Sequence, residues 1–128
     1  MTSSSKRALY AQGDILLEKI ADENITTETW RMVANDPDGA VVVGRGEESG
    51  HRHAIYGGGA KLLLQPTPLG EQMPSELYVG HLVVHAAGGV SLSHEEHAAI
   101  PLEPGTYRVR RQRQFSSTSD ARQRLVAD

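Results

Sequence analysis

The stretch ELYVGHLVVHA, residues 76–86, is the longest strand candidate in the chain and decides the fold class. Successive residues of a strand point to opposite faces, so His81 and His85 share one face while Leu82 and Val84 share the other. Both faces are largely apolar, which is typical of a strand with neighbours on each side. We therefore expect residues 76–86 to form a central strand.

Shorter strand candidates lie on both sides of this stretch and are separated by turns rich in glycine and proline. Several short strands with such turns are typical of an all-β domain. The sequence predicts a mainly β fold, a single-domain β-sandwich or barrel. The further strand candidates lie within residues 8–20, 40–47, 53–66 and 101–115, the third of these being two strands around Gly57-Gly58-Gly59 that we expect to form a hairpin.

The segment ITTETWRMVANDPDG, residues 25–39, is the one place where a short helix is expected. Trp30, Val33 and Ala34 fit one helix face, and Asn-Asp-Pro-Asp-Gly ends the segment. The run of threonines favours a strand instead, because β-branched residues are stiff in helices.

The length of 128 residues predicts one compact domain. We divide the chain into a flexible N-terminal arm at 1–8, one β domain at 9–115 and a C-terminal tail at 116–128. The sequence has no cysteine, no secretory signal at its N-terminus and no apolar run near the ~18 residues of a membrane span. We expect a cytoplasmic protein without a membrane contact. The formal net charge of −3 argues against nucleic-acid binding over the whole surface.

All six histidines lie between residues 51 and 97. In GHRHAIYGGG, residues 50–59, His51 and His53 are two apart and point to one face of a strand. In SHEEH, residues 93–97, His94 and His97 are three apart and share a face only on a helical turn. Four imidazoles in two short segments are candidate ligands of one metal site.

Neutral imidazoles next to a carboxylate suit a divalent transition metal, here Zn, Fe, Mn or Ni. Glu47 and Glu96 are the candidate supporting carboxylates. The alternative is that the four histidines are ordinary polar or hydrogen-bonded residues of a small β domain. For His81 and His85 a structural role is favoured. No residue stands out as a general base, so whether the protein is an enzyme stays open.

The stretch RVRRQRQF, residues 108–115, carries arginine on both faces of its predicted strand. We expect an edge strand, because charge on an edge prevents edge-to-edge aggregation. The alternative is a binding site for an anion or a partner, because guanidinium groups hold anions through paired hydrogen bonds. This reading makes the chain a non-catalytic assembly protein, a homo-oligomer or the partner of another protein, and nucleic acid ranks last as a partner. Its candidate residues are Arg108, Arg110, Arg111 and Arg113.

Residues 47–107 resemble the cupin superfamily of small β-barrels, which often bind a metal. The resemblance rests on the pair His51 and His53, the glycines after them, and the turn Pro104-Gly105. A cupin carries a glutamate shortly after its histidine pair and a histidine after its second turn. This chain has Arg108 where that histidine is expected, so the resemblance implies a metal only if His94 or His97 takes the missing places.

A second resemblance covers most of residues 10–115 in order. The stretch HEEHAAIPLEPGTYRVRRQRQF, residues 94–115, is similar to the C-terminal half of small uncharacterised bacterial and phage proteins. These proteins pair such a stretch with a GHxH segment like that at residues 50–53. The resemblance implies that the two histidine segments act together, and it implies no activity.

Overall fold

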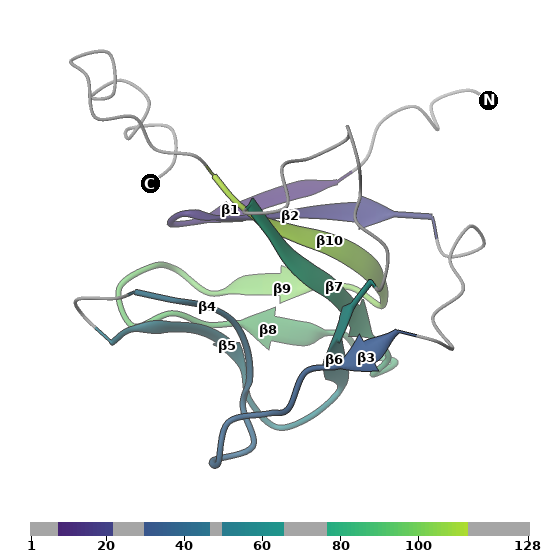
Figure 1. Ribbon diagram of the computed structural model, residues 1–128, viewed down its shortest axis with the longest axis horizontal. Helices are drawn as coiled ribbons and strands as arrows, with labels where there is room; N and C mark the ends of the chain where they lie inside the picture. The colour runs from purple at the N-terminus through teal and green to yellow at the C-terminus, as the bar shows by residue number, and fades with distance from the viewer. Residues whose placement is uncertain (1–7, 22–29, 47–49, 66–76, 113–128) are drawn as a thin grey trace.

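The computed structural model describes residues 8–21, 30–46, 50–65 and 77–112, and within them the fold is built from antiparallel strands (Figure 1). This confirms the predicted mainly β class. In chain order the strands are β1 (Leu9–Gln12), β2 (Ile15–Ile20), β3 (Arg31–Met32), β4 (Val41–Arg45), β5 (Arg52–Ile55), β6 (Ala60–Leu64), β7 (Tyr78–Val84), β8 (Val90–Leu92), β9 (Ile100–Leu102) and β10 (Gly105–Arg111). No helix long and apolar enough to cross a membrane is found in the described part of the chain.

Six strands form the main sheet in the order β1-β2-β10-β7-β6-β3. The strands β4 and β5 form one small sheet, and β8 and β9 form another. The expectation that residues 76–86 contain a central strand is confirmed, because β7 lies between β10 and β6. The outermost strands β1 and β3 do not pair with each other in the described residues, so the main sheet is open and the barrel alternative is wrong.

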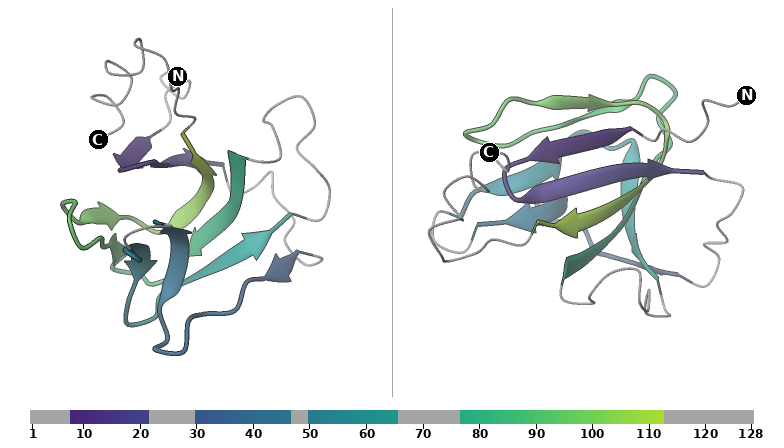
Figure 2. Two further views of the ribbon diagram at one scale, coloured as in Figure 1. Left: turned by 60° about the vertical axis from the view of Figure 1, so that its left-hand side comes forward. Right: turned by 90° about the horizontal axis from the view of Figure 1, so that it is seen from above.

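The core lies between the main sheet and the two small sheets (Figure 2). Leu17 and Leu82 from the main sheet are fully buried against Ile55, Leu92 and Leu102 from the small sheets. The alternation of each strand therefore places one apolar face in a shared core. Burial of these aliphatic side chains supplies most of the stabilising free energy.

The prediction that the arginine-rich strand is an edge strand is wrong. Strand β10 lies inside the main sheet and pairs with β2 on one side and β7 on the other. Its buried face carries Tyr107 and Val109, whereas Arg108 lies on the opposite face, where Glu18 of β2 forms an ion pair with it at 2.9 Å. A sheet that covers its core with one face tolerates charge on the other face, so arginine content did not determine the position of the strand.

The helix expected within residues 25–39 is not formed in its described part. Residues Arg31–Met32 form β3, which pairs with β6. The amide of Val33 continues this pairing by donating to the carbonyl oxygen of Leu62 at 2.8 Å. The edge of the main sheet therefore satisfies these backbone groups better than a single helical turn, most of whose amides have no internal partner. Residues 25–29 lie outside the described ranges.

The glycines at 57–59 do not close the expected hairpin. Strands β5 and β6 flank them but belong to different sheets, β5 pairing with β4 and β6 with β7. All three glycines have positive φ, between 83° and 93°. L-residues with side chains rarely adopt this conformation, so the glycines allow the chain to turn sharply from one sheet to another.

Candidate metal centre

The two histidine segments lie side by side because an isolated β-bridge joins them. The amide of Ala54 donates to the carbonyl oxygen of Ser93 at 2.9 Å, and the amide of Ser93 donates back at 2.8 Å. Ala54 follows His53 directly, and Ser93 precedes His94. This one bridge therefore brings together side chains that are about forty residues apart in the chain.

The four predicted histidines form one connected cluster of rings. The ring of His94 is central, with centroid distances of 4.3 Å to His53, 4.6 Å to His97 and 5.4 Å to His51. The rings of His53 and His97 are 6.2 Å apart and nearly parallel. The structure thus brings together all four residues that the sequence predicted as ligands, although contact between rings does not by itself make them ligands.

Three residues of this region have the geometry of a ligand set. One ligand atom from each of His51, His94 and Glu95 lies within 4.8 Å of the other two. Ligands of a zinc ion at bond lengths of about 2.0–2.2 Å are separated by about 3–4 Å, so small side-chain rotations close the remaining gap. Glu95 is exposed and the two histidines are partly buried, which leaves room for such rotations.

The backbone of β5 fixes the carboxylate of Glu95. The amide of Arg52 donates to Oε1 of Glu95 at 2.9 Å. This hydrogen bond is the main reason why the pKa of Glu95 is lowered. The carboxylate is therefore ionised at neutral pH and points toward the segment that carries His51.

The predicted supporting carboxylates have different outcomes. Oε2 of Glu96 lies 3.8 Å from Nδ1 of His51, so Glu96 belongs to the edge of the cluster. Its amide donates to Nδ1 of His94 at 3.0 Å. A metal bound at Nδ1 of His94 would replace this hydrogen bond. Glu47 lies outside the described residues.

A buried glutamine fixes the orientation of His53. The amide nitrogen Nε2 of Gln12 donates to the carbonyl oxygens of Leu92 at 3.0 Å and Ala98 at 2.9 Å. These two bonds leave Oε1 of Gln12 as an acceptor, 2.8 Å from Nδ1 of His53. His53 therefore carries its proton on Nδ1, and the lone pair of Nε2 points toward Asp14, whose Oδ1 lies 3.5 Å away.

This network predicts a single tautomer for His53. We expect long-range ¹H–¹⁵N correlation spectra near pH 7 to show His53 as the neutral tautomer protonated at Nδ1. The reason is that Oε1 of Gln12 accepts and cannot donate. A spectrum with the proton on Nε2 would contradict the orientation of Gln12.

Burial favours the neutral form of His53 and His94. His53 is only 4% exposed, and desolvation followed by repulsion from His94 lowers its pKa to about 4. Desolvation and the neighbouring His97 also lower the pKa of His94. Metal ions bind the neutral imidazole, so these shifts keep the lone pairs available at pH 7.

Gly13 allows the turn between β1 and β2 to approach the cluster. Its φ is 60°, and a Cβ atom at this position would lie 2.9 Å from Nε2 of His97 and 3.2 Å from Cε1 of His53. Any side chain here would displace one of the two rings. The glycine therefore packs the β1–β2 turn directly on the histidines.

Sequence reasoning missed three residues of this region. Glu95 stands between the two histidines of the HEEH segment, and only the direction of its side chain separates it from Glu96. Gln12 and Asp14 come from the opposite end of the chain, about forty residues before His53. Their pairing with His53 depends on how the β1–β2 turn packs, and no local pattern encodes it.

The other histidine pair is separate from the cluster. His81 is 3% exposed and its Nδ1 is hydrogen-bonded to the hydroxyl of Tyr78 at 2.7 Å. The amide of Gln65 donates to the same hydroxyl at 3.1 Å, and the ring of Trp30 lies 4.8 Å from that of His81. These contacts fit the structural role favoured for His81. His85 is exposed.

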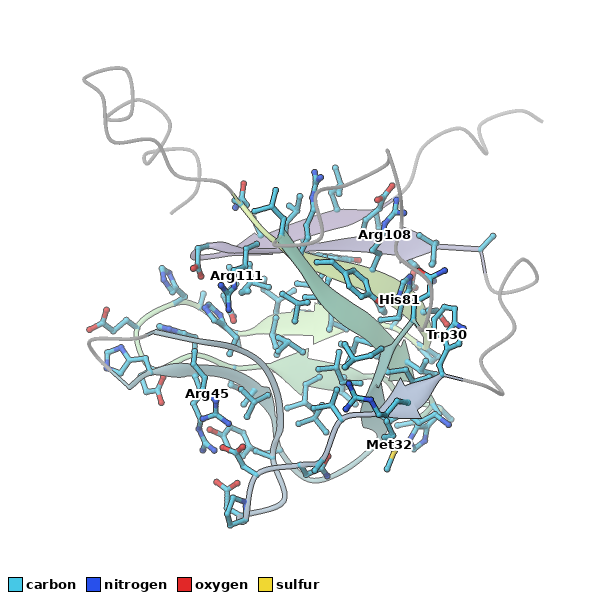
Figure 3. The ribbon with its side chains drawn as sticks, viewed as in Figure 1. Trp30, Met32, Arg45, His81, Arg108 and Arg111 are labelled. Atoms are coloured by element: carbon cyan, nitrogen blue, oxygen red, sulfur yellow. The ribbon has the colours of Figure 1, made fainter. Side chains whose placement is uncertain are left out.

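The described arginines of the predicted anion-binding set have different surroundings. Arg108 is paired with Glu18, whereas Arg110 and Arg111 are exposed at the end of β10. Arg108 lies in the middle of β10, whereas Arg111 is its last residue, and the two side chains lie apart in the view of Figure 3. Arg113 lies outside the described residues.

A family model described as "Domain of unknown function (DUF8820)" matches residues 11–112 of the chain. The match covers both histidine segments and every strand from β2 to β10. It supports the resemblance to an uncharacterised family and gives no support to the cupin resemblance. No curated protein and no solved structure matches the chain.

Proposed function

The chain belongs to the family described as "Domain of unknown function (DUF8820)", and we propose that it binds a divalent transition-metal ion through His51, His94 and Glu95. The observation that carries the proposal is the convergence of their ligand atoms within 4.8 Å. Two imidazoles and one carboxylate suit zinc, and they also suit iron, manganese or nickel.

The surroundings of the three residues support this proposal. His53 and His97 stand next to His94, so the region holds four imidazole groups in contact. The amide of Arg52 holds Glu95, as a hydrogen-bonded partner holds a ligating carboxylate in many metal sites. Three protein ligands leave a position for water or a small molecule.

Isothermal titration with ZnCl₂ tests the proposal on protein freed of metal by a chelator and then dialysed. We expect one zinc per chain for the natural sequence, and at least about tenfold weaker binding for His51→Ala and His94→Ala, since loss of even a supporting partner costs that much. His85→Ala is the matched control, because His85 is exposed and outside the cluster.

The carboxylate has its own matched pair of variants. Glu95→Gln keeps an oxygen to accept from the amide of Arg52 but loses its charge, so we expect clearly weaker zinc binding. Glu96→Gln is the control and is expected to bind zinc nearly normally.

In ¹⁵N spectra the amide of Glu96 should shift on zinc addition, because the metal and this amide compete for Nδ1 of His94. Unchanged zinc binding in both histidine variants would refute the site.

A further inference from the structure

A cavity of about 330 Å³ lies between β4 and the β3 side of the main sheet, apart from the three residues of the metal proposal. The apolar part of its wall comes from distant parts of the chain: Val33 follows β3, Val43 belongs to β4, Leu62 and Leu64 to β6, and Val79 to β7. The volume is near the lower end of the range of about 300–1,000 Å³ typical of ligand pockets. It suits a small molecule rather than a nucleotide.

The charged residues of the cavity give it an excess of positive charge. Asp36, Arg45 and Arg111 are its ionisable lining residues. Asp36 forms ion pairs with both Arg45 and Arg52, and these two guanidinium groups lower its pKa. Its single negative charge is thus shared between two arginines.

Arg111 is the residue that distinguishes this cavity from a simple apolar groove. Among the residues that the structure describes, no carboxylate forms an ion pair with it. It reaches the cavity from the end of β10, on the same side of the molecule as Arg45 (Figure 3). A guanidinium at an apolar pocket favours a ligand with one anionic oxygen group, which it can hold through two parallel hydrogen bonds.

We propose that this cavity binds a small amphipathic carboxylate, a molecule with a short aliphatic body and one carboxylate end. The body lies against the partly exposed side chains of Val33, Leu64 and Val79, where burial of apolar surface stabilises it. The carboxylate pairs with Arg111. This inference does not rest on the metal site, although Gly44 of the cavity wall lies close to His53.

Sodium hexanoate is the probe that we choose, titrated into the ¹⁵N-labelled full chain. A chelator is present throughout, so that a carboxylate bound to metal contributes nothing. We expect saturable amide shifts at the lining residues Val43, Leu62 and Val79. Hexanol, which has the same aliphatic body and no charge, should bind at least about tenfold more weakly, as for the loss of a hydrogen bond between charged groups.

Two neighbouring arginines give a matched pair of variants. Arg111→Gln should weaken hexanoate binding by about tenfold or more. Arg110→Gln removes an equal charge from the adjacent exposed residue, which does not line the cavity, and should change binding less than about twofold. Ala34→Phe places a ring in the cavity from an exposed wall position and should abolish binding while the fold stays intact.

The opposite results would overturn the proposal. These are the absence of saturable shifts with hexanoate, shifts that saturate away from the cavity, or equal affinity for hexanoate and hexanol. Equal weakening by Arg111→Gln and Arg110→Gln would also overturn it, because the charge would then act through the general field of the protein rather than through contact.

Discussion

Replacing Gln12 with methionine is expected to lower the free energy of unfolding by about 4 kcal/mol. Gln12 is 3% exposed and makes three hydrogen bonds, two to backbone carbonyl oxygens and one to His53. Methionine has a similar volume, so the change leaves little cavity. It leaves the carbonyl oxygen of Leu92 and Nδ1 of His53 without this partner, and each of these buried groups costs about 1–3 kcal/mol. The carbonyl oxygen of Ala98, an exposed residue, can bind water instead.

Urea unfolding with a chelator present measures this loss, and Gln112→Met is the matched control. Gln112 lies in the same region and its side chain donates one long hydrogen bond, 3.3 Å, to the carbonyl oxygen of Gly13. It is only partly buried, so water replaces the lost partner and we expect a change below about 1 kcal/mol. Equal losses in the two variants would show that the buried network of Gln12 adds no special stability.

The role of Gln12 illustrates what the sequence could not predict. Short strand candidates between turns predicted the β class, and apolar residues on both faces predicted the central place of β7, because both patterns are local. The two histidine segments were expected to act together, and the Ala54–Ser93 bridge places them side by side. Gln12 binds His53 across 41 residues of sequence and Leu92 across 80, and no local pattern predicts this packing.

The error over β10 has a similar origin. A strand with arginine on both faces was assigned to an edge, where charge prevents edge-to-edge aggregation, but Arg108 has a charged partner far away in the sequence. Glu18 supplies that partner from β2, as the residue directly paired with Arg108 in the sheet. Opposite charges on paired residues stabilise antiparallel strands. The order of strands therefore depends on distant pairs, whereas the existence of a strand depends on its own residues.

Acidification is expected to destabilise the fold through His81. Burial, with repulsion from Arg108, lowers the pKa of His81 to about 4 from an ordinary value of 6.5. Between these two values the unfolded chain binds a proton at this residue and the folded chain does not. The stability contributed by His81 is thus fully present above about pH 6.5 and is lost as the pH falls toward 4. The loss between pH 7 and pH 4.5 is about 2 kcal/mol.

His81→Asn isolates this effect, measured as the free energy of unfolding in urea across that pH range with a chelator present. Asparagine can accept from the hydroxyl of Tyr78 but does not titrate, so we expect the pH dependence to become flatter by about 2 kcal/mol. His85→Asn removes an exposed histidine from the same part of the chain and should leave the pH dependence nearly unchanged. His53 has a lowered pKa for the same reason, so part of the acid sensitivity persists in His81→Asn. A pH dependence as steep in His81→Asn as in the natural sequence would mean that His81 takes up its proton without leaving the folded state.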